Sequence, residues 1–117
     1  MRIINRKKGQ EFKISNEIIA TLIDSEWHSS VMIIRCPPGR KLYFNNGEGI
    51  PPRLIPAYKP FTLRKGESIW IDDEIAVFMC VTSPSFSTIG VDAPEHITLL
   101  GEEAYDINHP MNKGATA

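Results

Sequence analysis

Basic side chains that could bind phosphate groups occur in three groups along this 117-residue chain. They form one cluster near the N-terminus and two adjacent pairs: Arg2, Arg6, Lys7 and Lys8; Arg40 and Lys41; and Arg64 and Lys65. Lysine and arginine bind polyanions by neutralising phosphates and displacing their counterions. The N-terminal cluster also fits an edge strand that charged residues keep soluble. The residue types alone leave both interpretations open.

The net charge of −1 conceals an unequal distribution along the chain. Residues 1–60 hold ten Lys and Arg against five Asp and Glu, whereas residues 61–117 hold three against nine. The first part therefore carries +5 and suits a polyanion, and the second carries −6 and does not. Attraction between the two parts within the molecule is a simpler explanation of the same asymmetry.

Residues typical of enzymes and metal sites are scattered. The three histidines have neither a partner four residues away nor a cysteine at ligand spacing (His28, His96 and His109). No nucleophile elbow, phosphate-binding glycine-rich motif or dinucleotide fingerprint occurs. Acidic pairs at 72–73 and 102–103 fit a turn and a helix start. We predict that the protein is not an enzyme and holds no metal or cofactor.

Cysteine spacing and hydropathy suggest an ordinary globular protein. Cys36 and Cys80 are far apart and lack metal-like spacing, so we expect both to be reduced and partly buried. The chain has no run of about 18 apolar residues and no signal-peptide pattern. We therefore predict a cytoplasmic protein without membrane association.

Two segments 57 residues apart are similar. Lys8–Ile18 aligns with Lys65–Ile75, with Lys, Gly, Ile, Glu and Ile identical at matched positions. After a one-residue slip, Val31–Pro38 aligns with Ser87–Pro94. This repetition predicts a duplicated unit. Because each copy alone would bury too little surface, we expect both to share one core.

Short runs of β-branched and aromatic residues between turn formers predict strands almost throughout. Their spacing of about 8 to 12 residues favours a small antiparallel sandwich or barrel. Residues 45–60 are rich in glycine and proline, which predicts a partly extended linker. Glu102–Ile107 is the one good helix candidate, and we expect 108–117 to be a frayed tail.

The second copy resembles the carbon storage regulator (CsrA/RsmA) family along nearly the family's full length, in segments 64–77, 89–95 and 101–105. In the first copy, Met1–Gly9 resembles the family's opening strand and turn. Members of that family form interlaced homodimers of five-stranded chains with a C-terminal helix. The resemblance implies a monomeric single-chain pseudo-dimer, with repeats at 1–44 and 61–107 in one globular domain.

Family members bind GGA-containing RNA hairpins between the first strand of one subunit and the fifth strand of the other. Ile4 and Arg6 match the family's first-strand contacts, with Lys7 and Lys8 adding charge. In the fifth strand, Gly101 stands where the family has its central RNA-contacting arginine. This site therefore keeps only half of its cationic pair.

The reciprocal site departs further from the family's pattern. Leu63 stands at the first-strand arginine position, although Arg64 and Lys65 follow. Its fifth strand contains Arg40 and Lys41, which could hold phosphate, followed by Tyr43 and Phe44. One of these aromatic residues could stack on an unpaired base, or both could pack within the strand.

The resemblance implies a translational regulator that binds GGA hairpins in messenger or small regulatory RNA, and the unequal sites favour binding at only one of them. The acidic second part and Gly101 favour an alternative. In that alternative, a CsrA-like protein-interaction module without RNA binding modulates another regulator or a flagellar or secretion factor.

Overall fold

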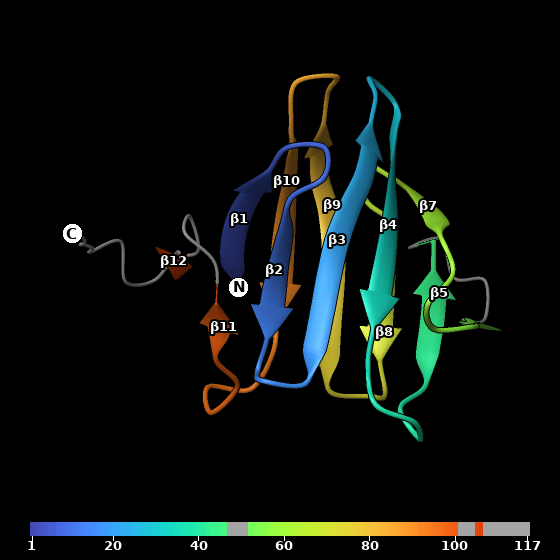
Figure 1. The fold of residues 1–117 in the computed structure, drawn as a ribbon, viewed down its shortest axis with the longest axis vertical. Coiled ribbons are helices and arrows are strands. Elements are labelled where there is room, and N and C mark those ends of the chain that lie inside the picture. Colours follow the sequence, from blue (N-terminus) through green and yellow to red (C-terminus); the bar gives the residue numbers. More distant parts are fainter. Residues whose placement is uncertain (47–51, 101–104, 107–117) are drawn as a thin grey trace.

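Two antiparallel sheets packed face to face make up the computed structural model, which describes residues 1–46, 52–100 and 105–106 (Figure 1). The larger sheet contains seven strands, in spatial order β12 (Tyr105–Asp106), β1 (Arg2–Arg6), β10 (Ser87–Asp92), β9 (Ile75–Thr82), β8 (Ser68–Ile71), β5 (Leu42–Asn45) and β6 (Arg53–Ile55). The smaller sheet contains five, in the order β11 (Leu99–Leu100), β2 (Glu11–Ile14), β3 (Ile18–Ser25), β4 (Ser29–Arg35) and β7 (Phe61–Arg64). The expected mainly β, antiparallel fold is confirmed, as two sheets and not as a closed barrel.

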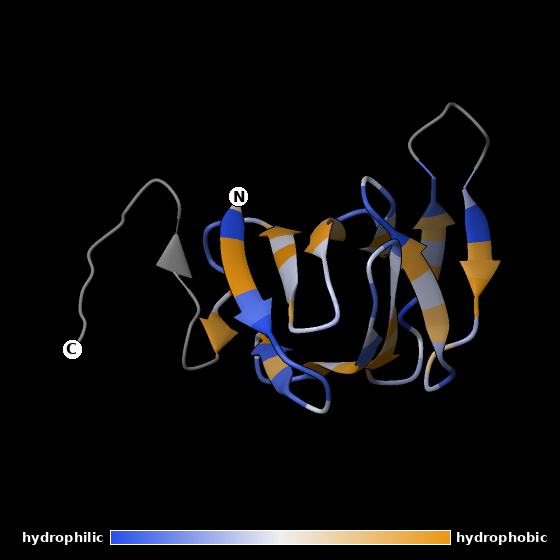
Figure 2. Ribbon diagram, turned by 90° about the horizontal axis from the view of Figure 1, so that it is seen from above, coloured by the Kyte–Doolittle hydropathy of each residue, from blue (hydrophilic) through white to orange (hydrophobic). Residues whose placement is uncertain are grey.

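Alternation along the strands builds the core between the sheets. In β4, Ser30, Met32 and Ile34 are buried, whereas their neighbours are half-exposed. Figure 2 shows the same alternation as hydrophobic and hydrophilic bands along the strands. Since successive side chains of a strand point to opposite faces, each strand supplies every second residue to the core. The largest fully buried side chains come from both sheets: Phe12, Ile4, Ile14, Ile18, Leu22, Met32, Ile34, Leu42, Leu63, Ile69, Ile71 and Ile75.

Each sheet combines strands from both parts of the chain. β1 and β5, from the first part, pair with β10 and β8 of the second part. Conversely, β7 and β11 pair with β4 and β2. The two parts are therefore interlaced, and neither can leave without breaking backbone pairing in both sheets.

The two three-stranded units β2–β3–β4 and β8–β9–β10 have the same registers when 57 is added to each residue number. Leu22 lies opposite Met32, as Met79 lies opposite Ile89. In each unit the register shifts just after these pairs, at matching positions. Gly9 and Gly66 have φ values of 88° and 89° in equivalent turns.

The predicted one-residue slip is therefore wrong, because the 57-residue offset continues through β4 and β10. Leu63 pairs with Ser30 just as Arg6 pairs with Ser87. Shifting a strand by one residue would exchange its buried and exposed faces. Ile89 is fully buried and matches Met32, which is also fully buried, rather than the half-exposed Ile33.

The expected helix over Glu102–Ile107 is not confirmed. Within that range only Tyr105 and Asp106 are described, and they form β12, whose backbone pairs with Ile3 and Arg2 of β1. A strand edge carries unpaired backbone groups, and added extended backbone satisfies them. The expected tail, 108–117, lies outside the described residues. In the part of the chain that the structure describes, there is no helix long and apolar enough to span a membrane.

Residues expected to form a linker contribute an edge strand. β6 pairs with β5 and is bounded by Pro52 and Pro56. Edge strands tolerate nearby proline because one side of the strand needs no backbone donor. After β6, Tyr58 fastens the chain to the end of β4, with its N–H donating to Ile34 O (3.1 Å) and its hydroxyl to Cys36 O (3.0 Å).

Candidate nucleic-acid interface

Strands from the two sheets approach each other at two opposite edges of the molecule, with β1 and β11 on one side and β7 and β5 on the other (Figure 1). At the first edge, Arg2 Nη1 donates to the carbonyl of Ile97, just before β11, at 2.6 Å. At the second edge, β5, β6 and β7 line a common pocket. These are the pairs of strands between which the sequence predicted RNA sites.

The first edge uses its two best-matched residues for packing. Ile4 is fully buried, so its side chain is not accessible to a ligand. Arg6 is only 4% exposed. Its guanidinium donates to Asn5 O at 2.6 Å and Glu11 O at 3.0 Å. Both side chains are therefore engaged within the fold, which argues against a direct contact with RNA, and their role in RNA binding stays a prediction.

Burial of Arg6 changes how the second edge compares with the first. Leu63 holds the equivalent register position in β7 and is fully buried. The side chain at this position packs inward in both edges, so Leu63 does not deprive the second edge of an exposed cation. The exposed cations come directly after this position, as Lys7 and Lys8 at the first edge and Arg64 and Lys65 at the second.

Two of the cations predicted to contact RNA form ion pairs with acidic residues of the protein. Lys8 Nζ lies 3.8 Å from a carboxylate oxygen of Asp24. Arg40 lies 3.0 Å from Asp72, 3.1 Å from Glu17 and 3.7 Å from Glu74.

These contacts fasten the loop before β5 to the acidic turns around it. The hydrogen bond to Glu17 is the main cause that raises the pKa of Arg40 above its ordinary value. Lys41 keeps an exposed side chain, and its backbone N–H donates to Asp72 Oδ1 at 3.0 Å. Arg40 therefore acts as a structural clamp in this state.

A pocket of about 390 Å³ opens between β5, β6 and β7. Phe44 and Phe61 contribute half-buried rings, and Arg53 and Lys59 contribute exposed cations. The guanidinium carbon of Arg53 lies 5.1 Å from the centroid of the Phe44 ring, within the range of a cation–π contact. Sequence reasoning missed Arg53 and Lys59 because they lie in the segment predicted to be a linker. The signal that could have found them is a pair of basic residues among prolines.

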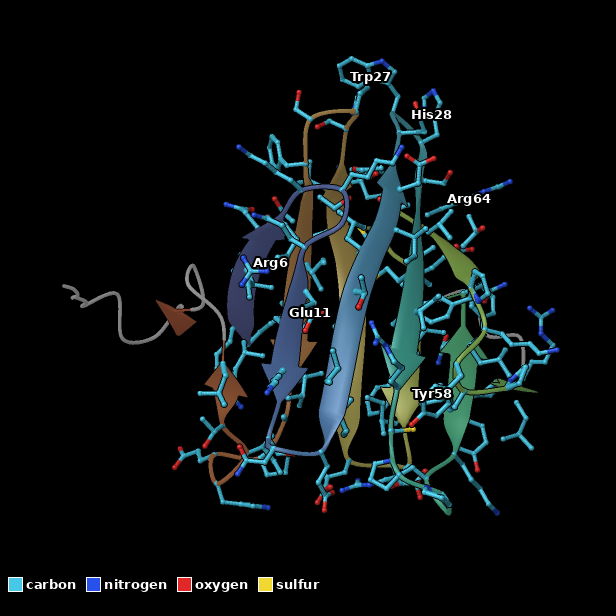
Figure 3. The ribbon with its side chains drawn as sticks, viewed as in Figure 1. Arg6, Glu11, Trp27, His28, Tyr58 and Arg64 are labelled. Carbon is cyan, nitrogen blue, oxygen red and sulfur yellow. The ribbon has the colours of Figure 1, made fainter. Side chains whose placement is uncertain are left out.

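A second pocket, of about 420 Å³, opens at the far end of β7 beside the β3–β4 turn. It is lined by Trp27, His28, Arg64, Lys65, Val81 and Thr82. Figure 3 shows Trp27 and His28 at the tip of this turn, with Arg64 below them on β7. Trp27 is 69% exposed. Large aromatic side chains are usually buried, so this exposure marks Trp27 as a candidate ligand-contacting residue.

Together the two pockets form a basic and aromatic strip along β7. It carries four exposed cations, Arg53, Lys59, Arg64 and Lys65, beside three aromatic rings. Among the described residues, no carboxylate lines either pocket. Cations beside exposed rings suit a single-stranded nucleic acid, whose phosphates and bases they can hold at the same time.

Comparison with known proteins gives the family. The chain is 34% identical over 55 residues to the translational regulator CsrA of Clostridium botulinum (strain ATCC 19397 / Type A), covering 47% of this chain and 76% of that protein. It is 36% identical over the same length, with the same coverage, to the translational regulator CsrA of the Okra / Type B1 strain. The chain belongs to the CsrA family. No family model and no solved structure matches it.

The registers of β5 and β11 show which residue of the first part corresponds to Gly101. Leu42 pairs with Ile71, as Leu99 pairs with Ile14, so the 57-residue offset also relates β5 to β11. By the same offset, Phe44 corresponds to Gly101, which lies outside the described residues. The arginine that the family resemblance predicts at this position is therefore absent from both parts of the chain.

Proposed function

We propose that this CsrA-family protein is a cytoplasmic translational regulator that binds messenger or small regulatory RNA at the β5–β6–β7 edge. The observation that carries the proposal is the strip along β7, in which four exposed cations lie beside Trp27, Phe44 and Phe61. Phosphate contacts would supply affinity, and stacking on the rings would hold unpaired bases. GGA-containing hairpins are the expected RNA targets, from the resemblance of the sequence to the family.

Arg53 takes the place of the missing fifth-strand arginine in this proposal. Phe44 stands at the expected arginine position, and Arg53 of the neighbouring strand lies over its ring. The guanidinium thus reaches the same region from β6. The opposite edge would bind more weakly, since Arg2 and Arg6 are engaged with backbone carbonyls.

We also propose that the chain is a duplicated, single-chain pseudo-dimer that works as a monomer. Support comes from the common registers of the two three-stranded units and from the exchange of β1, β5, β7 and β11 between the parts. A covalent connection keeps the two parts at high effective concentration. Native mass spectrometry should give one chain per particle, and a stable two-chain assembly would contradict this part of the proposal.

Fluorescence anisotropy with labelled hairpins tests RNA binding. A hairpin with GGA in its loop and a matched hairpin without it are titrated at two salt concentrations. Arg53→Gln should weaken binding by about 1 to 3 kcal/mol and lower the salt dependence by about one counterion. Lys13→Gln is the matched control, because Lys13 is exposed on β2 outside both pockets. Equal binding of both hairpins, or equal effects of the two substitutions, would contradict the proposal.

A second candidate function is a CsrA-like protein-interaction module that modulates another regulator or a flagellar or secretion factor. The −6 charge of residues 61–117 and the absence of an arginine at 101 favour it. It predicts no RNA binding in the anisotropy experiment at either salt concentration.

A further inference from the structure

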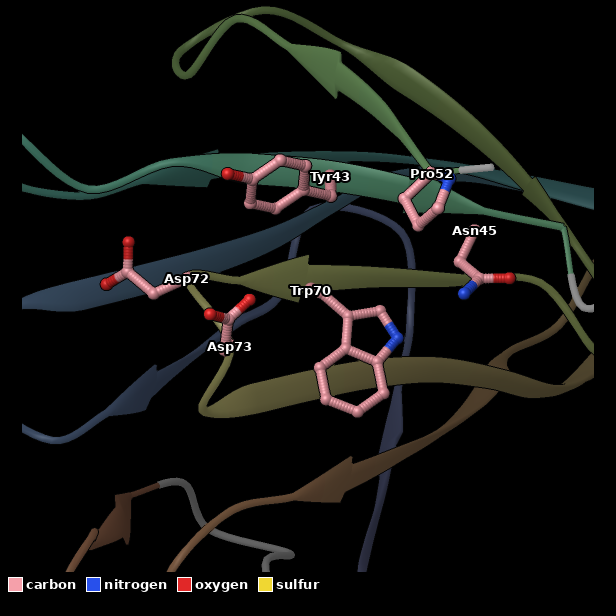
Figure 4. A pocket seen from close by; sticks show the side chains of 6 residues that line it. All are labelled: Tyr43, Asn45, Pro52, Trp70, Asp72 and Asp73. Atoms are coloured by element: carbon pink, nitrogen blue, oxygen red, sulfur yellow. The ribbon is translucent and has the colours of Figure 1, made fainter. Parts of the chain in front are cut away.

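The outer face of the seven-stranded sheet holds a pocket whose chemistry is opposite to that of the β7 strip. The pocket has a volume of about 380 Å³ and is lined by Tyr43, Asn45, Pro52, Trp70, Asp72 and Asp73. Figure 4 shows the two rings on neighbouring strands, with both aspartates at one end of the pocket. The residues before and after Trp70, Ile69 and Ile71, are fully buried, so Trp70 faces away from the core.

Two aromatic rings form the body of this pocket. Tyr43 of β5 and Trp70 of β8 are direct cross-strand partners, and both are half-exposed. Leu54 of β6 lies opposite Tyr43 and is 61% exposed, which extends the apolar surface toward the sheet edge. Tryptophan and tyrosine faces attract cations through their ring quadrupoles, and arginine stacks flat on them.

Two carboxylates supply negative charge at one end of the pocket, next to the aromatic rings. Asp72 is held in place, since Oδ2 accepts from Arg40 at 3.0 Å and Oδ1 from the Lys41 N–H at 3.0 Å. Asp73 is exposed, and its carboxylate makes no ion pair or hydrogen bond with the described part of the chain. One negative charge of the pocket is therefore uncompensated and available to a ligand.

The fold does not require this chemistry. At the equivalent register positions of the other sheet, Lys13 stands 57 residues before Trp70 and Leu100 stands 57 residues after Tyr43. Ser15 and Asn16 precede Asp72 and Asp73 by the same offset. Neutral or basic side chains are thus compatible with the same backbone pairing. The aromatic and acidic set is therefore particular to this sheet face and is not imposed by the strand pairing.

We propose that this pocket binds the side chain of an arginine in a basic segment of a partner protein. The guanidinium would lie against Trp70 and Tyr43 and donate hydrogen bonds to the Asp73 carboxylate. RNA is the less suitable ligand, because the uncompensated Asp73 carboxylate repels phosphates. This site lies beyond the proposed RNA-binding function and does not depend on it.

Tryptophan fluorescence tests the proposal with a defined probe. The chain has two tryptophans, so Trp27→Phe leaves Trp70 as the single reporter. In this background, the peptide acetyl-Gly-Arg-Gly-Arg-Gly-amide should change the Trp70 emission saturably, and less so at high salt. The same peptide with citrulline in place of arginine keeps the shape and removes the charge. It should bind at least about tenfold more weakly if charge and cation–π attraction drive recognition.

Two substitutions and one control locate the binding. Asp73→Asn should weaken the arginine peptide about fivefold or more, and Tyr43→Leu should also weaken it. Glu95→Gln makes the same carboxylate-to-amide change at an exposed position outside the pocket and should have no effect. Circular dichroism confirms that each variant folds.

Three results would overturn the proposal: equal binding of the arginine and citrulline peptides, no effect of Asp73→Asn in a folded variant, or a Trp70 response to an RNA hairpin but not to the peptide. The last result would make the pocket a nucleic-acid site.

Discussion

The hydroxyl oxygens of Ser30 and Ser87 lie 2.6 Å apart in the buried interior and join β4 to β10 across the two sheets. These serines occupy equivalent positions 57 residues apart. Ser30 also contacts Thr82 Oγ1 at 2.5 Å, and Ser87 contacts Ser25 Oγ at 2.7 Å. Buried hydroxyls are tolerated when they are hydrogen-bonded, so this row of linked hydroxyls favours one alignment of the two sheets.

Ser87→Ala should lower the free energy of unfolding by about 1 to 3 kcal/mol, because it leaves Ser25 and Ser30 without a shared partner. Urea denaturation measures the change. Ser85→Ala is the control, since Ser85 is exposed in the neighbouring turn and should change stability little. Equal stability of the two variants would show that the hydroxyl cluster contributes nothing.

Gly9→Ala and Gly66→Ala should each cost about 1 kcal/mol of stability, because alanine is strained at positive φ. The two costs should be equal. Both glycines have φ near 90°, and a Cβ added at either would meet no atom within 4 Å. Asparagine, which tolerates this region better, should cost less at both sites. Clearly different costs in thermal unfolding would mean that the two turns are not equivalent.

Strand positions could be predicted from the sequence because alternation and turn residues are local signals. The alignment of the two repeats after Val31 was predicted wrongly. Matching Ile33 with Ile89 aligns identical residues, but it places a residue of the outer face of one strand against a residue of the inner face of the other. The two faces of β4 are both apolar, so hydropathy alone did not distinguish Met32 from Ile33. Only pairing with β7 and β3 fixed which of them points inward.

The candidate site was harder to predict than the fold. Basic residues are easily found in a sequence, but whether a cation is free depends on groups that the fold brings near it. Arg6 meets the carbonyl of Glu11, and Arg40 meets Asp72, which lies 32 residues away. Arg53 joins the site because β6 pairs with β5, and its proline-rich surroundings did not predict a strand.

Arg6→Met should affect stability more than RNA binding. The substitution removes the hydrogen bonds to Asn5 O and Glu11 O and should lower the free energy of unfolding by about 1 to 3 kcal/mol. Affinity for the GGA hairpin, measured per folded molecule, should change less than about twofold, since Arg6 does not line the β7 strip. Lys7→Gln, at an exposed neighbouring position, should leave stability unchanged. A folded Arg6→Met variant with strongly reduced affinity would return the main RNA site to the first edge.

Arg40→Gln should lower stability by about 1 kcal/mol, since it removes a cation shared by three carboxylates. The loss should shrink at high salt, which screens these partly exposed pairs. Lys41→Gln is the neighbouring control and should cost little, because its exposed side chain has no ion pair with the described residues. Denaturation at low and high salt distinguishes the clamp from a phosphate contact, for which Arg40→Gln would leave stability unchanged.

Cys36 and Cys80 should react slowly with iodoacetamide at neutral pH. Burial raises the pKa of both thiols above the ordinary value of 9.0, and Cys36, at 3% exposure, should react more slowly than the half-exposed Cys80.

The raised pKa of the two thiols also makes the free energy of unfolding depend on pH. Below about pH 9 both states keep the thiols protonated, whereas above it the unfolded chain ionises first, so the free energy of unfolding should fall as pH rises. Cys36→Ala should make that fall shallower in urea denaturation between pH 8 and 10. An unchanged slope would mean that Cys36 ionises as readily in the folded protein as in the unfolded chain.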